Sequence, residues 1–194
     1  MDAGTALARL KSGNERFVRG ELAAVAGRKP ETSPMAVVLA CSDAKVPPEM
    51  VFDQVLGDLY TVRDAGNVAG PEQIVMIEKA AQDTGARLLV VLGHSGCDAV
   101  QATLDQLRLP EEERDEALAP VVSRIAPAVS ELLSSKLAED EAALLAAAVE
   151  SNTLAAVEHL LHDSDFLESH MQSGGLAIVG AVYDLETGKV SFFE

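Results

Sequence analysis

The sequence lacks tryptophan and has few aromatic side chains, with Phe, Tyr and Trp making up 4% of its 194 residues. Stacking of nucleic-acid bases on aromatic rings is therefore not a plausible binding mode for this chain. Positive charge is also scarce, because 15 Lys and Arg residues stand against 31 Asp and Glu residues, for a formal net charge of -16. A charge of this sign repels polyanions. We therefore expect no nucleic-acid partner and a core built from Leu, Val, Ile and Ala.

Long apolar segments are also missing. No apolar run approaches the ~20 residues that a membrane-spanning helix needs. The first stretch, MDAGTALARLKSGNERF, is charged and amphipathic and does not resemble a secretory signal. We expect a soluble, cytoplasmic protein with no membrane partner.

The chain has two cysteines, Cys41 and Cys97, which allow at most one disulfide. A cytosolic location keeps thiols reduced, and each cysteine has a second possible metal ligand two or three positions away. Asp43 accompanies the first cysteine and His94 the second. The pattern favours a metal site. The alternative is that both cysteines are small core residues and that His94 is an ordinary loop histidine.

The hydrophobic pattern predicts an α/β fold of one domain overall. Short Val-rich runs at 35–41 and 87–94 are typical of strands buried on both faces, and residues 58–66, 176–184 and 189–194 fit further strands. Helical spacing covers residues 3–19, 71–84, 98–109 and 111–162. Gly13 is a potential break in the first helix, and Pro110, Pro120 and Pro127 interrupt the later helical region. We predict a mostly parallel central β-sheet flanked by helices. An N-terminal helical arm and loop (1–34) precedes a zinc-binding α/β domain (35–194).

Both ligand stretches fall at the carboxyl ends of predicted strands, where open α/β sheets gather their functional groups. We therefore expect Cys41, His94 and Cys97 to converge, with Asp43 in reserve. Two thiolates and an imidazole select zinc over magnesium or calcium. The other histidines, at positions 159, 162 and 170, have no cysteine nearby and are interpreted as surface or packing residues.

Four segments resemble β-class carbonic anhydrases, and together they cover nearly the whole chain. They are LKSGNERFVRG, CSDAKVPPEMVFDQVLGDLYTVRDAGN, VVLGHSGCDAV and LAIVGAVYDLETGKV. The resemblance implies that Cys41, His94 and Cys97 bind Zn²⁺, and that Asp43 either is a fourth ligand or moves aside for water. It also implies a homodimer or homotetramer, with the site near the subunit interface and the N-terminal helices embracing the partner.

The first motif departs from the family pattern C-x-D-x-R, because Lys45 stands at the arginine position. Lysine has no planar fork with which to clamp a carboxylate. We therefore hypothesise that Asp43 is held less firmly and spends more time on the metal, which lowers activity at neutral pH.

Other departures surround the expected substrate pocket. Thr32 stands where the family often has glutamine, Lys79 where it often has tyrosine, and Asp98 where it has glycine. Tyr60 keeps the family's aromatic residue. The pair Gly66 and Asn67 is expected to form a turn that lines the site, since glycine adopts backbone angles that other residues avoid.

The resemblance implies zinc-dependent, reversible hydration of carbon dioxide to bicarbonate by a zinc-bound hydroxide. Asp43 would orient the nucleophile, with Lys45 as its partner. One alternative is a related zinc hydrolase that acts on carbonyl sulfide or carbon disulfide. Another is a weakly active or inactive zinc-binding homologue with a sensing or interaction role. Assays on the three substrates separate these readings.

Overall fold

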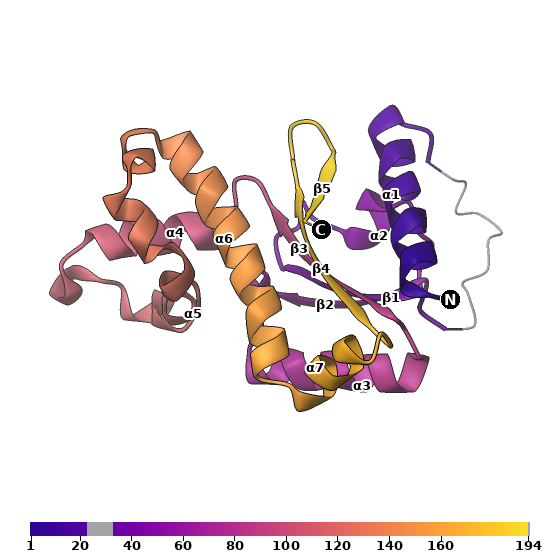
Figure 1. Ribbon diagram of the computed structural model, residues 1–194. Coiled ribbons are helices and arrows are strands. Elements are labelled where there is room, and N and C mark those ends of the chain that lie inside the picture. The colour runs from indigo at the N-terminus through magenta and orange to yellow at the C-terminus, as the bar shows by residue number, and fades with distance from the viewer. Residues whose placement is uncertain (23–32, 194) are drawn as a thin grey trace.

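A five-stranded sheet with strand order β2-β1-β3-β4-β5 forms the centre of the computed structural model, which describes residues 1–22 and 33–193 (Figure 1). The strands are β1 (Ala36–Cys41), β2 (Leu59–Asp64), β3 (Leu88–His94), β4 (Ala177–Tyr183) and β5 (Val190–Phe193). All neighbouring pairs are parallel except β4 and β5, which form an antiparallel hairpin. The predicted α/β class and all five predicted strands are confirmed. Thr32 lies outside the described residues.

Helices cover both faces of the sheet because β1 and β3 are apolar and buried along their whole length. Side chains alternate between the faces of a strand. Val38 and Ala40 face the core under α1 (Ala3–Arg19) and α2 (Pro48–Val51), whereas Val37 and Leu39 face the opposite core. That second core lies under α3 (Pro71–Thr84), α6 (Glu141–His162) and α7 (Asp165–Gln172). Figure 1 shows α1 and α3 on opposite sides of the sheet.

Helix α1 runs unbroken through Gly13, so the potential break there was wrong. The reason for the glycine is a close contact, because a Cβ at position 13 would lie 1.8 Å from the carbonyl oxygen of Phe52. The next residue, Asn14, is buried and donates to the carbonyls of Val51 and Gly188, while its oxygen accepts from Val190 N at 2.9 Å. The helical arm is therefore packed on its own sheet and bonded to the last hairpin.

A helical lobe continues the molecule beyond the carboxyl ends of β1 and β3, at the left of Figure 1. It contains α4 (Asp98–Arg108), α5 (Ala119–Val129) and the first half of α6, with short 3-10 turns at Glu111–Glu113, Glu116–Leu118, Ser130–Ser134 and Lys136–Glu139. The predicted helical stretch 111–162 is thus divided into several pieces. The cysteines belong to the apolar core of this lobe, together with Ile125 and Val129.

One segment, Glu116–Ser134, corrects the expectation that no apolar run reaches the length of a membrane span. Its 19 residues reach a mean hydropathy of 1.2. By length and composition alone, the segment is long and apolar enough to cross a membrane. The segment is divided between two 3-10 turns and α5, and Ile125 and Val129 within it are fully buried. The absence of a membrane partner stays a prediction.

Candidate metal centre

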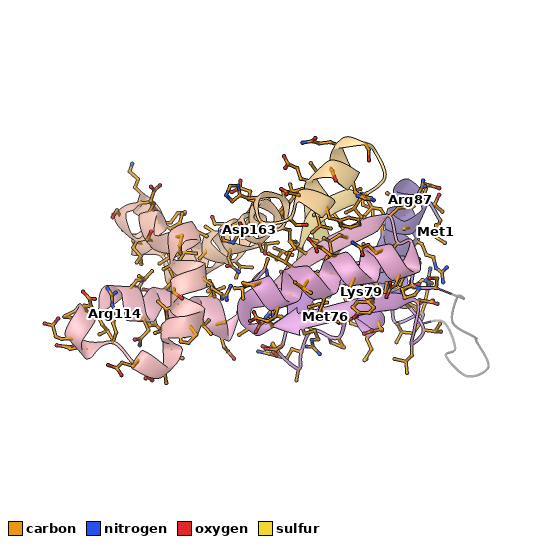
Figure 2. The ribbon with its side chains drawn as sticks, turned by 90° about the horizontal axis from the view of Figure 1, so that it is seen from below. Met1, Met76, Lys79, Arg87, Arg114 and Asp163 are labelled. Carbon is orange, nitrogen blue, oxygen red and sulfur yellow. The ribbon has the colours of Figure 1, made fainter. Side chains whose placement is uncertain are left out.

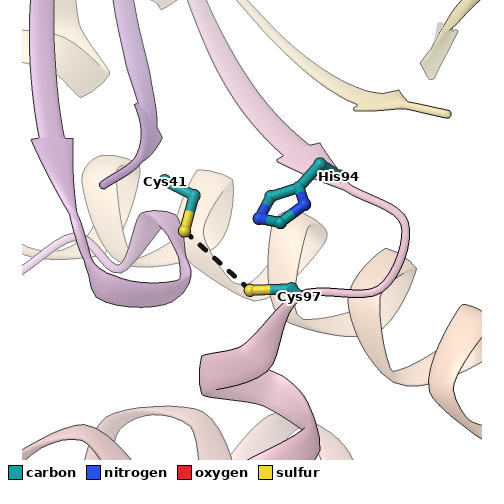
Figure 3. A group of neighbouring side chains, drawn as sticks. All are labelled: Cys41, His94 and Cys97. Carbon is teal, nitrogen blue, oxygen red and sulfur yellow. Dashed lines mark hydrogen bonds between the residues drawn. The ribbon is translucent and has the colours of Figure 1, made fainter. Parts of the chain in front are cut away.

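Three buried side chains meet at the carboxyl edge of the sheet (Figure 3). Cys41 is the last residue of β1, His94 is the last residue of β3, and Cys97 directly precedes α4. Neighbouring parallel strands end at the same edge, so these positions converge because β1 pairs with β3. Their possible ligand atoms all lie within 4.8 Å of one another, and each residue is at most 4% exposed.

The two sulfur atoms fit a zinc ion. Cys41 Sγ and Cys97 Sγ are 3.9 Å apart. Two zinc–sulfur bonds of about 2.3 Å at a tetrahedral angle span about 3.8 Å. The backbone N–H of Asp43 also points at Cys41 Sγ, with a nitrogen–sulfur distance of 3.4 Å. The separation of the thiols therefore matches a tetrahedral ion between them.

His94 presents one ring nitrogen to the thiols and fixes the ring with the other. Its Nδ1 lies 3.0 Å from the carbonyl oxygen of Ser95, which can only accept a hydrogen bond. The Nδ1 atom therefore carries the proton, and Nε2 has a lone pair. Within the described residues that Nε2 atom is buried and has no hydrogen-bond partner. Buried polar atoms are seldom left unsatisfied, and a metal ion supplies the missing partner.

The electrostatics of the two cysteines also favour a bound cation. The hydrogen bond from Cys97 lowers the pKa of the Cys41 thiol, against the effect of burial, and His94 lowers it further. The same contact with Cys41, together with burial, raises the pKa of the Cys97 thiol. The pair therefore shares one proton when no cation lies between the sulfur atoms. Cys41 and Cys97 would both be thiolates with a divalent ion bound between them, because such an ion favours loss of the shared proton.

Asp43 is bonded to Lys45 through both of its oxygens. The backbone N–H of Lys45 donates to Asp43 Oδ1 at 2.8 Å, and the ammonium nitrogen lies 3.1 Å from Oδ2. Burial raises the pKa of Asp43, but these two contacts outweigh it and the pKa is lowered overall. Among the described residues, the group of converging ligands holds Cys41, His94 and Cys97 without Asp43. The hypothesis that Asp43 moves onto the metal stays untested.

A surface hollow of about 350 Å³ opens beside the cysteines. Its lining residues are Cys41, Ser42, Asp43, Ala65, Asp98 and Ala99. The candidate ligand Cys41 thus borders a space large enough for a small substrate, and Asp43 borders the same space.

The family described as Carbonic anhydrase matches residues 36–190. The chain belongs to this family. Carbonic anhydrase 2 of Mycobacterium tuberculosis is 35% identical over 190 residues, covering 93% of this chain and 87% of the relative. A carbonic anhydrase of Mycolicibacterium smegmatis is 34% identical, covering 93% of this chain and 88% of the relative.

Solved structures of β-carbonic anhydrases share the fold. The β-carbonic anhydrase CcaA superposes with a TM-score of 0.74 at 24% identity, over 84% of this chain and 81% of that one. Two tetrameric β-carbonic anhydrases from Sordaria macrospora are represented by a match with a TM-score of 0.71 at 19% identity, over 98% of this chain and 92% of that one. The resemblance to the β class that the sequence motifs indicated is confirmed.

Within this carbonic anhydrase, the predicted Gly66–Asn67 turn lies close to the cysteines. Gly66 has a left-handed backbone with φ 66°, and Asn67 has φ 48°. Asn152 of α6 donates to the carbonyl of Gly66 at 2.7 Å, and Gly66 N–H helps to lower the pKa of Cys41. The turn therefore supports Cys41, a candidate ligand, from behind.

Tyr60 and Lys79 do not line the hollow within one chain. Tyr60 is half-buried and packs against the core under α3. Lys79 is exposed on α3, where Figure 2 shows it at the surface, and its ammonium group is bonded to the carboxylate of Asp83. Their role in a substrate pocket stays a prediction.

Two further residues near the cysteines, Arg63 and Asp98, were not among the predicted site residues. Arg63 donates from Nε to the carbonyl of Cys41 at 2.8 Å and from Nη2 to the carbonyl of Asp43, so it holds the ligand loop. The signal lay in strand register, because β2 runs beside β1 and pairs Ala40 with Arg63. Asp98 lines the hollow, and its signal was the departure from the family's glycine.

Proposed function

We propose that the chain catalyses the reversible hydration of carbon dioxide to bicarbonate with Zn²⁺ bound by Cys41, His94 and Cys97. The observation that carries the proposal is the buried group of two thiols and an unpartnered imidazole nitrogen, 3.9 Å between the sulfur atoms, in a member of the carbonic anhydrase family. Zinc in such a site lowers the pKa of water so that a hydroxide nucleophile is available near neutral pH.

The ligands hold the ion in a defined geometry. The carbonyl of Ser95 fixes the tautomer and the plane of the His94 ring. Ser95 is itself fixed, because its N–H donates to the carbonyl of Tyr183 and its hydroxyl accepts from Leu185 N at 2.9 Å. His94 therefore stays directed at the two sulfur atoms.

Asp43 orients the attacking oxygen. Its carboxylate borders the same hollow as Cys41 and accepts a hydrogen bond from the nucleophile, so that an oxygen lone pair faces the carbon of the substrate. Lys45 restrains both oxygens of Asp43, one through its backbone N–H and one through its ammonium group. The lowered pKa of Asp43 keeps the carboxylate ionised and able to accept.

We also propose a homodimer or larger homo-oligomer. Strand β2 is an edge of the sheet, and apolar side chains near it are exposed. Leu56 is 77% exposed and Val75 is 61% exposed, and Met76 lies exposed on α3 in Figure 2. Apolar surface of this kind is typical of an interface. The cytoplasmic location stays a prediction.

Stopped-flow hydration of carbon dioxide, with metal content measured on the same samples, tests the proposed activity. We expect wild-type protein to contain zinc and to hydrate carbon dioxide, and Cys97→Ser to lose both. Ser130→Ala, a substitution at an exposed position of the helical lobe, serves as the control. A zinc-loaded, folded wild type without hydration activity would refute the proposal. Hydrolysis of carbonyl sulfide or carbon disulfide in that case would favour the sulfur analogues as substrates.

A further inference from the structure

Asp98 places a carboxylate at the mouth of the metal site. It is the first residue of α4, directly after the ligand Cys97, and Figure 3 shows that helix beginning at the cysteine. The residue is exposed and lines the same hollow as Cys41 and Asp43. Its carboxylate therefore borders the space in which a small ligand would lie.

The charges around the hollow show what this carboxylate changes. The positive groups are Lys45, bound to Asp43, and Arg63, which is directed at backbone carbonyls. The negative groups are Asp43, Asp64, which accepts from the N–H of Ala65, and Asp98. In the described part of the chain no ion pair joins Asp98 to a cation. Among these five groups the negative charges exceed the positive ones by one, and a neutral residue at position 98 would remove that excess.

The field of Asp98 reaches the motif loop. The pKa of Lys45 is raised, first by its hydrogen bond to Asp43 and the charge of that residue, and more weakly by Asp98 and Cys97. Because Asp98 lines the hollow, its charge also acts on any charged molecule within it.

We infer that Asp98 is a specificity residue that weakens the binding of anions in the hollow and leaves the binding of neutral molecules unchanged. The inference rests on the proposed function, because the anion that matters is then bicarbonate, whereas carbon dioxide is neutral. Unit charges about 7 Å apart at the edge of a protein change anion affinity about three- to tenfold at moderate ionic strength. Asp98 therefore favours release of bicarbonate and resists inhibition by small anions.

Asp98 also stands at a helix start, where a carboxylate has a structural role. An acidic residue in the first turn of a helix stabilises that helix through the macrodipole. This role changes thermal stability but does not distinguish anions from neutral ligands. Asp165 offers a matched control, because it is an exposed carboxylate in the first turn of α7 and does not line the hollow.

The test uses the cobalt(II)-substituted protein, whose visible absorption reports ligand binding without any turnover. Azide serves as the anionic probe and imidazole as the neutral probe, each titrated into wild type, Asp98→Asn and Asp165→Asn. We expect Asp98→Asn to bind azide about three- to tenfold more tightly, with imidazole affinity unchanged. The gain should shrink as salt is added. We expect Asp165→Asn to match wild type for both probes. An equal change for azide and imidazole, or no change for azide, would overturn the inference.

Bicarbonate dehydration provides the kinetic counterpart. The negative charge of bicarbonate stays in the site as carbon dioxide leaves, so Asp98 acts alike on bound bicarbonate and on the transition state. We expect KM for bicarbonate to fall about three- to tenfold in Asp98→Asn, and only there, with kcat/KM raised by the same factor. An unchanged KM for bicarbonate contradicts the inference. A different outcome separates the two proposals. If neither wild type nor the variants turn over, but Asp98→Asn still binds azide more tightly than wild type and Asp165→Asn do, the proposed function fails while the role of Asp98 stands.

Discussion

The floor and the mouth of the metal site follow different rules. The floor consists of the buried residues Cys41, His94 and Cys97. The ends of two paired strands place Cys41 and His94, and the start of α4 places Cys97. The mouth includes Lys45 and Asp98, both exposed and supplied by a loop and a helix start. The floor matches the motif that the sequence resembles, whereas Lys45 departs from its C-x-D-x-R pattern. Strand register fixes the geometry that a metal needs, whereas exposed positions remain free to tune charge and substrate.

The largest effect is expected where the floor is broken. His94→Gln removes the imidazole nitrogen that faces the thiols, and we expect the metal content and the hydration rate to fall to background. His162→Gln, at an exposed histidine near the end of α6, is the matched control and should keep both. Metal analysis and stopped-flow assays on the two variants check this. A His94→Gln protein that retains one zinc per chain would show that the floor is not the metal site.

A pair of glycine substitutions tests the packing behind the floor. A Cβ at Gly66 would lie 2.8 Å from Ile125 Cδ1, whereas a Cβ at Gly96 would meet nothing within 4 Å. Both glycines have left-handed backbones, at φ 66° and φ 63°, so the backbone strain of an alanine is similar. We expect Gly96→Ala to cost about 1 kcal/mol of unfolding free energy and Gly66→Ala about 2–3 kcal/mol. Equal losses in urea unfolding would contradict the steric argument.

The strands and the ligand set were predictable because the signals are local. Val-rich runs identified β1 and β3, and the ligands follow those runs directly. Helix α2 has four residues and α7 has eight, too short for periodicity to reveal them. Gly13 was misread because its reason is a contact with Phe52, far away in the sequence. The restraint on the Asp43 carboxylate could not be predicted from side-chain types either, because one of its two hydrogen bonds comes from the backbone N–H of Lys45.

Substitutions at Lys45 sharpen the comparison at the mouth. Lys45→Met removes the ammonium contact with Asp43 Oδ2 but keeps the backbone N–H that bonds Oδ1. We expect kcat for hydration to fall about tenfold, since a less restrained carboxylate orients the nucleophile less well. Lys45→Arg should match or exceed wild type, because a guanidinium can bond a carboxylate twice. Zinc content should be unchanged in both variants. Wild-type kcat in Lys45→Met would mean that the backbone N–H alone is sufficient.

The smallest effect is expected at the hairpin behind Ser95. Asp184 accepts hydrogen bonds from the backbone N–H groups of Glu186 and Thr187 at 2.9 and 2.7 Å. The bond from Thr187 N–H is the main cause of the lowered pKa of Asp184. We expect Asp184→Ala to destabilise the fold by about 1 kcal/mol at pH 7. A lowered folded pKa means stability that is present above the unfolded value and lost as the pH falls through the folded one.

The difference between Asp184→Ala and wild type should therefore shrink below about pH 4, where the carboxyl group starts to take up a proton in the unfolded state. Thermal unfolding at pH 7 and at pH 3 measures it. A difference that stays constant between these pH values would exclude the charge of Asp184 as its source.

The buried side chain of Asn14 has a consequence for how the chain is made. Its partners at Gly188 and Val190 lie 174 and 176 positions further along. Contacts of such long range form late, because the intervening polypeptide must first be brought together. On the ribosome the amphipathic helix is therefore synthesised long before its docking surface is complete. Its apolar stripe stays available to chaperones until the hairpin emerges.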